Sequence, residues 1–184
     1  MDKIVKNNVD KIKKIILAVG FLECGELNIN KLEYSKEIRK MCEDNVCRCY
    51  NTTWACPPAV GTIDECKKRV ENYSHMILLS NSYKIKTPFD YKSMKKGMVN
   101  FKEKIYLLDD SLKKAISKYQ ILSNESCNIC KECTYPKFPC RHKDKLFHSI
   151  EGYGFHIYKL AKDCNLKYDN GENTITYFGA VLFS

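Results

Sequence analysis

Apolar residues recur at helical intervals in three parts of the chain. Residues 3–18 form one apolar helix face, and residues 94–119 form a longer face that predicts a helix of about seven turns. Residues 146–164 repeat the pattern and predict a third helix. The positions that define the three faces are Val5, Val9, Ile12 and Ile16; Met94, Met98, Phe101, Ile105, Leu108, Leu112, Ala115 and Tyr119; and Leu146, Ile150, Tyr153, Ile157, Leu160 and Cys164.

Other segments have the composition of β-strands. Residues 75–85 and 174–183 are rich in β-branched, aromatic and other apolar side chains, and residues 21–32 alternate loosely. The pair Asn170-Gly171 is a hairpin signal, which makes residues 166–168 the expected partner of the last strand.

The order of these elements indicates the fold class. Shorter helices are expected at 34–41 and 62–70, between the strand-like segments. The pattern predicts an α+β fold with a small mixed or antiparallel sheet covered by helices. The length fits a single domain, residues 1–184, with two cysteine-rich loops.

The composition limits the classes of binding partner that this protein is expected to have. The net charge is +9, and the lysines concentrate at 84–104, either as a solvated helix face or as a docking face for an acidic partner. No nucleic-acid-binding module is present. The longest apolar run, 15–22, is far shorter than the ~20 residues of a membrane span. Asp2, Asp10 and Glu23 argue against a signal peptide, so we expect a cytoplasmic protein with no membrane and no nucleic acid partner.

Cysteine is the chemically distinctive residue. The chain has 11 cysteines, an odd number that excludes complete internal disulfide pairing. At this length the core does not need disulfide bonds, and in a reducing compartment clustered cysteines more often bind metal or do redox work. Cys24 and Cys164 lie in apolar segments and are expected in the core.

Residues 127–142 contain the more diagnostic cysteine group. Its ligand candidates follow a C-x2-C-x2-C run with a fourth cysteine seven positions later: Cys127, Cys130, Cys133 and Cys140. This run is typical of a cubane iron–sulfur cluster, whereas a zinc site normally combines two separate pairs. Zinc and unligated redox thiols remain alternatives.

Residues 42–66 contain the group that comes first in the chain, in which five thiols compete for four places. The candidates are Cys42, Cys47, Cys56 and Cys66, with Cys49 as an alternative ligand. Two prolines after Cys56 force an extended chain there. Tyr50 and Trp54 either shield a cluster from solvent or pack ordinarily.

Three polar residues that follow Cys140, the last cysteine of the second group in the chain, are candidates for supporting roles. Arg141 could offset cluster charge or bind an anion. His148 and Glu151 would lie three apart on one face of the predicted helix, as a proton relay or as a solvated face, with Asp144 as the helix cap. His75 and His156 are expected to be structural. No Ser-His-Asp triad, P-loop or G-x-G-x-x-G motif is present.

Three stretches together resemble a known family. Residues 42–61 (CEDNVC…WACPPAVG), 127–142 (CNICKECTYPKFPCRH) and 149–183 resemble the prokaryotic predicted metal-binding proteins, domain of unknown function 2284. The resemblance covers nearly the whole chain from about residue 20. It implies metal binding and no specific activity. The family motif falls on Cys42, Cys47, Cys56, Cys127, Cys130, Cys133, Cys140 and Arg141; Cys49 lies outside it and Cys66 is a less certain member.

These observations predict a cytosolic metal-binding protein with two cubane iron–sulfur clusters that transfers electrons with a partner redox protein. Two alternatives remain. If only three cysteines hold the N-terminal cluster, one iron is open and the protein is an iron–sulfur enzyme. If the metal is zinc, the loops are structural or mediate an interaction.

Overall fold

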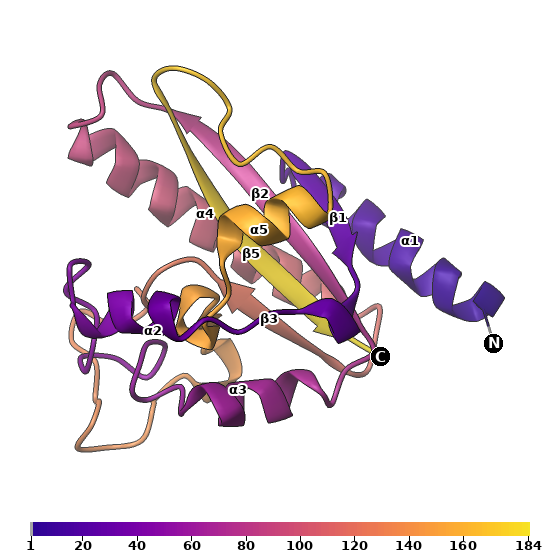
Figure 1. Cartoon of the computed structure of the whole chain (residues 1–184), viewed down its shortest axis with the longest axis horizontal. Helices are drawn as coiled ribbons and strands as arrows, with labels where there is room; N and C mark the ends of the chain where they lie inside the picture. The colour runs from indigo at the N-terminus through magenta and orange to yellow at the C-terminus, as the bar shows by residue number, and fades with distance from the viewer. Residues whose placement is uncertain (1) are drawn as a thin grey trace.

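The computed structural model describes the backbone of residues 2–184 and the side chains of residues 8–184; Val5, one of the predicted apolar positions, lies outside the described side chains. Five α-helices and a five-stranded mixed sheet confirm the predicted α+β class (Figure 1). The helices are α1 (Asp2–Ala18), α2 (Lys36–Glu43), α3 (Ile63–Val70), α4 (Tyr91–Leu112) and α5 (Ile157–Asp163). The strands are β1 (Glu23–Leu27), β2 (His75–Lys84), β3 (Tyr119–Ser123), β4 (His148–Ser149) and β5 (Thr174–Phe183). Short 3-10 turns cover Ile29–Lys31, Lys143–Lys145 and Glu151–Tyr153.

The two long strands occupy the middle of the sheet, whose order is β1-β2-β5-β3-β4. β2 and β5 pair antiparallel along their full length, from His75 opposite Phe183 to Lys84 opposite Thr174. β1 pairs antiparallel with β2 at one edge, β3 pairs antiparallel with β5, and β4 joins β3 in parallel at the other edge. The partners of β5 are therefore β2 and β3, and residues 166–168, which were predicted to form a hairpin with it, are not a strand.

Both faces of the central strands are buried, which explains their nearly continuous apolar sequences. On one face, Ile77, Leu79 and Val181 pack against α1 and α4. On the other face, Leu78 and Leu182 pack against α3, α5 and the Glu151–Tyr153 turn. The sheet is thus the middle of three layers, with the cysteine loops beside α2 at one side of the molecule (Figure 1).

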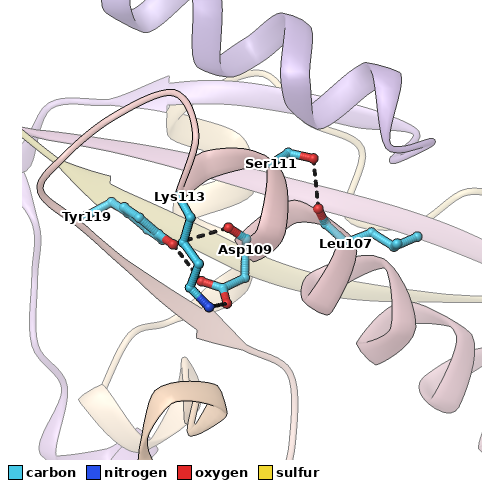
Figure 2. A network of polar contacts seen from close by, with 5 residues as sticks. All are labelled: Leu107, Asp109, Ser111, Lys113 and Tyr119. Atoms are coloured by element: carbon cyan, nitrogen blue, oxygen red, sulfur yellow. Dashed lines mark hydrogen bonds and ion pairs between the residues drawn. The ribbon is translucent and has the colours of Figure 1, made fainter.

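The long helix is shorter than its apolar pattern predicts. α4 ends at Leu112, and Tyr119, which was expected on the helix face, begins β3 instead. The Asp109 carboxylate accepts from Lys113 Nζ at 2.6 Å and from the Tyr119 hydroxyl at 2.7 Å (Figure 2). Ser111 Oγ donates to the Leu107 carbonyl at 2.9 Å within the same last turns (Figure 2). The chain turns after α4, and Tyr119 returns to the helix from outside it, at a spacing that mimics the helical repeat.

The predicted helix 146–164 is also wrong over most of its length. Only Ile157–Asp163 is α-helical, and the earlier part consists of β4 and a 3-10 turn that ends at Gly154. Gly154 has φ of +79°, a left-handed conformation that ends the turn and that glycine adopts at little cost. Asp144 lies inside the Lys143–Lys145 turn and caps no helix.

The remaining helix and strand predictions are close to the structure. Thr62 caps α3 through a reciprocal capping box with Glu65, which matches the expected start at 62. Helix α2 and strands β1 and β2 also begin within two residues of the expected positions. None of the described helices is both long and apolar enough to cross a membrane.

Because both faces of β2 are covered, neighbouring leucines on that strand should be equally sensitive to truncation. Leu78→Ala and Leu79→Ala should each lower the free energy of unfolding by about 2–5 kcal/mol, measured by urea denaturation. Leu107→Ala, on the exposed side of α4, is the matched control and should cost under about 1 kcal/mol. A small effect at either β2 leucine would mean that one face of the sheet is open.

Candidate metal centre

The two cysteine loops pack against each other, although about 80 residues separate them in the sequence. Trp54 Nε1 of the first loop donates to the Phe138 carbonyl of the second at 3.2 Å. The Trp54 ring meets Tyr135 edge-on, with centroids 4.9 Å apart. Thr53 and Ser126 hydroxyls lie 3.1 Å apart. The first loop also pairs with the sheet edge, where the Ser149 amide donates to the Ala55 carbonyl at 2.8 Å. The chain therefore brings both cysteine groups to one region, next to β4 and on the side of the molecule where α2 lies (Figure 1).

Four cysteines of the first loop line one cavity of about 640 Å³: Cys42, Cys47, Cys49 and Cys56. The second loop and the β4 region contribute Glu125, Ser126, Ser149 and Glu151 to the same cavity. Tyr50 lies on its wall, whereas Trp54 belongs to the second group. The structure thus brings the alternative ligand Cys49 to the same place as three of the predicted ligands.

Cys56 is the thiol best prepared to act as a ligand. Hydrogen bonding from Cys49 lowers the pKa of Cys56, although burial opposes this, and the hydroxyls of Thr53, Ser149 and Ser126 add to the effect. The same hydrogen bond raises the pKa of Cys49, together with burial. Burial raises the pKa of Cys42 to about 11 and also raises that of Cys47. A metal would have to displace the protons of the thiols that it binds, and its positive charge supplies the driving force.

Cys66 lies apart from this group. It is fully buried on α3, in the core beneath the sheet, and is not among the residues that line the cysteine cavity. Its thiol donates to the Val60 carbonyl at 3.5 Å, and Arg69 lies 3.9 Å from its sulfur. Burial raises the pKa of Cys66. In this structure Cys66 behaves as a core thiol, as do the partly buried Cys24 and Cys164, which pack against the two apolar clusters as expected.

The second group surrounds a smaller cavity, lined by Cys127, Cys130, Cys133 and Cys140. Thr53 and Trp54 of the first loop close one side, and Arg141 also lines it. The His142 amide lies 3.4 Å from Cys140 Sγ, as a donor to a ligand sulfur would. The cavity holds about 20 Å³, which is enough for one water, so seating a cluster requires this loop to spread outward.

A buried lysine lies near both cysteine groups. Lys102, on α4, is only 4% exposed, and its ammonium donates to the Asn124 carbonyl at 2.6 Å. Burial lowers its pKa, while the nearby Glu125, Glu151, Cys127 and Cys56 oppose that shift. The Lys102 ammonium therefore lies within electrostatic range of a cysteine from each loop and of two carboxylates.

Lys102 was not singled out from the sequence, where it is one of many lysines at 84–104. The available signal was its position: it follows Met98 by four residues and precedes Ile105 by three, on the apolar stripe of α4. Asn124, Glu125, Ser126 and Ser149 carry no comparable sequence signal, because the pairing of β3 with β4 is what brings them to the cysteines.

The three supporting candidates have different surroundings. Glu151 lines the first cavity, and desolvation raises its pKa to about 7. His148 instead lies 3.1 Å from the Tyr153 hydroxyl, which also accepts from Arg69 at 3.0 Å and from Gln120 at 2.8 Å. The helix face that was expected to pair His148 with Glu151 does not exist, so the structure provides no basis for that proton relay. Arg141 lies beside the second group and donates to the Glu132 carbonyl at 2.6 Å.

A family model described as predicted metal-binding protein, domain of unknown function 2284, matches residues 25–183. The chain belongs to this family. Membership confirms the resemblance carried by the two cysteine motifs and supports metal binding, with the metal unspecified. Neither the curated proteins nor the solved structures gave a significant match.

The cysteines of the family's motif suit a sulfur-rich cluster better than a single metal ion. Within the described part of the chain, no three His, Cys, Asp or Glu side chains come close enough to hold a single metal ion. Their donor chemistry nevertheless suits a sulfur-rich group. Asn124 lines the first cavity, and its buried Nδ2 has no hydrogen-bond partner. The Asn124 amide, the hydroxyls around Cys56 and the His142 amide beside Cys140 can all donate hydrogen bonds to sulfur. Hydrogen bonds to the sulfur atoms of an iron–sulfur cluster tune its reduction potential.

The buried His148 should make stability depend on pH. Desolvation, followed by the Arg69 charge, lowers its pKa from 6.5 to about 4, so the unfolded state binds the proton more tightly. Stability from this group is complete above pH 6.5 and is lost as the pH falls toward 4. Between pH 7 and pH 5 the loss should be about 2 kcal/mol.

The measurement is urea unfolding of wild type and His148→Gln at both pH values, with His156→Gln as an exposed-histidine control. His148→Gln should remove about 2 kcal/mol of pH dependence and His156→Gln should not. Equal pH dependence in all three proteins would show that His148 is not held neutral.

Proposed function

We propose that this protein holds one cubane iron–sulfur cluster in each cysteine group and passes electrons between them to a partner redox protein. The observation that carries the proposal is the packing of the two loops, through Trp54, Tyr135 and Ser126, around neighbouring sets of four cysteines. Loops that pack against each other in this way would hold two clusters close together, which suits electron transfer between them. The C-x2-C-x2-C run of the second group favours iron–sulfur over zinc.

In this proposal the ligands of the second cluster are Cys127, Cys130, Cys133 and Cys140. Those of the first are Cys42, Cys47 and Cys56, with Cys49 rather than Cys66 as the fourth, because only Cys49 lines the cavity. The clusters would supply reversible one-electron chemistry. The chain's own residues hold the thiolates, exclude water with Trp54 and Tyr50, and donate hydrogen bonds to sulfur.

Lys102 has a specific part in this arrangement. Two thiolate-bound clusters bring negative charge into a partly buried region that already contains Glu125 and Glu151. A buried ammonium near one cysteine of each loop offsets that charge and favours the reduced, more negative state of either cluster.

The partner's docking site follows from the remaining lysines. Lys102 is buried and Lys104 donates to the Gly20 carbonyl, so the whole stretch 84–104 is not one basic face. Lys92, Lys95 and Lys96 remain exposed near the start of α4 and are the proposed contact for an acidic redox partner.

Metal and sulfide analysis of protein purified without oxygen tests the proposal. We expect about eight iron and about eight acid-labile sulfide per chain, a brown colour, and reversible reduction of both clusters. Cys130→Ser should remove about half of the iron, whereas Cys164→Ser, in the core, should leave it unchanged. A colourless protein that contains zinc and lacks iron and sulfide would instead support a structural zinc protein.

The cavity beside the first group favours a second candidate function, an enzyme in which only Cys42, Cys47 and Cys56 hold the cluster. A volume of about 640 Å³ is the size of a small-molecule site, and an iron without a protein ligand would face it.

Cys49→Ala separates the two candidates, with Cys66→Ala as the matched control. Under the electron carrier, Cys49→Ala should lose about half of the iron because one cluster lacks its fourth ligand. Cys66→Ala should keep all of the iron and cost about 1 kcal/mol of stability as a core substitution. Full iron in Cys49→Ala, with a cluster spectrum that changes when small thiols are added, would favour the enzyme. Iron loss in Cys66→Ala would refute the assignment of Cys49.

A further inference from the structure

The first cysteine loop begins on α2, a helix with no buried residue. Cys42 lies in the last turn of this helix, which is eight residues long. The helix lies beside the Glu151–Tyr153 turn (Figure 1). A helix this short is marginal by itself, and most helices in proteins are stabilised by packing an apolar face. The position of Cys42 therefore depends on other contacts of α2.

Arg39 provides such a contact. Its two terminal amino groups donate hydrogen bonds to two carbonyls outside the helix, those of Gly61 and Gly152. In the part of the chain that the structure describes, no other α2 side chain donates a hydrogen bond to another element. Lys40, the next residue, pairs with acidic side chains at the end of the same helix. A planar guanidinium holds two acceptors at once in a fixed geometry, which an ammonium does not reproduce.

Both acceptors belong to the surroundings of Cys56. Gly61 follows Cys56 in the same loop. Gly152 packs on Pro57, the next residue after Cys56, so closely that a Cβ on Gly152 would lie 3.2 Å from Pro57 Cδ. Arg39 therefore connects the helix that carries the first thiol of the loop to the segment that carries the last.

The far end of the loop is fixed independently of α2. Arg69, on α3, donates to the Val60 carbonyl and, at 3.0 Å, to the Tyr153 hydroxyl. Val60 itself is fully buried. Because these contacts do not involve α2, loss of Arg39 would release the helix and leave the far end of the loop in place.

A loop that is connected at both ends is better prepared to bind one group with several thiols. A flexible chain must lose conformational entropy before distant cysteines meet, and a site that is ordered beforehand avoids that cost. Cys42 and Cys56 come from opposite ends of the loop and line the same cavity. The hydrogen bonds of Arg39 maintain this arrangement.

We propose that Arg39 is a positioning residue for the first metal centre, whose two hydrogen bonds hold Cys42 at the cavity that Cys56 also lines. This role rests on the proposed function only for the identity of the metal group, because the hydrogen bonds act on the protein chain itself. The bridge between two carbonyls is what matters, so a lysine of the same charge should not replace Arg39.

Hydrogen–deuterium exchange tests the role without reference to the metal. In protein purified without oxygen, the backbone amides of residues 39–43 should exchange at least about tenfold faster in Arg39→Gln and in Arg39→Lys than in wild type. The amides of α3 should keep their wild-type protection. Lys40→Gln is the matched control on the same helix and should leave exchange unchanged, because its ion pairs are exposed.

Release of iron to a chelator, followed by absorbance, reports on the metal centre. Both Arg39 variants should release one half of their iron at least about tenfold faster than wild type, because opening of α2 exposes the Cys42 ligand, and the other half at the wild-type rate. Lys40→Gln should behave as wild type does.

Two results would overturn the role of Arg39. Wild-type exchange and iron release in Arg39→Lys would show that only the charge is needed. Loss of protection throughout the chain, or equal acceleration for all of the iron, would show that Arg39 stabilises the fold in general and does not position Cys42.

Metal content is measured in every preparation, so the two proposals fail separately. Faster exchange of α2 in Arg39 variants of a protein that contains zinc would support the positioning role and overturn the iron–sulfur carrier. Full iron in wild type, with unchanged exchange in both Arg39 variants, would do the reverse.

Discussion

The antiparallel pairing of β2 with β5 is the interaction on which the rest of the structure depends. Its ten-residue register places alternate side chains of both strands into two separate apolar clusters, and a shift of one residue would exchange every side chain between them. β5 also pairs with β3, so this register determines where β3 ends. The second cysteine loop begins immediately after that point. The position of Cys127 is thus a consequence of how the core strands pair.

The cysteine loops depend on the same framework for their mutual contact. β4 pairs with β3, and the Ser149 amide of β4 then donates to the Ala55 carbonyl of the first loop. This contact is next to Cys56, the thiol with the lowered pKa, and Ser149 is one of the groups that lower it. Lys102 reaches the region from α4, on the opposite layer of the sheet. Each layer of the fold therefore contributes to one chemically coherent region, although no contiguous stretch of sequence contains it.

The strands and helices that could be predicted were those whose periodicity reports directly on packing. Central strands buried on both faces have continuous apolar sequences, and α1, α3 and β2 were found close to where they were expected. The wrong predictions concern segments in which apolar residues recur at helical intervals although the chain is not helical there. Tyr119 lies seven residues after Leu112 because the chain turns and re-enters the core as β3. Ile150, Tyr153 and Ile157 are all buried or half-buried from a β4–turn–helix segment that packs against one cluster, and side chains directed to one core from a turn imitate a helix face.

The amino-acid sequence by itself determined the family, the α+β class and the two sets of cysteines, because ligand spacing and apolar periodicity are local properties. It left five thiols competing for the first group. Only the tertiary structure separated Cys49, which lines the cavity, from Cys66, which is buried on α3. It alone showed that the buried Lys102 lies near cysteines of both groups and that His148 and Glu151 have different surroundings. These relations join segments far apart in the chain. They are set by strand pairing and burial on both faces of the sheet, which local spacing does not encode.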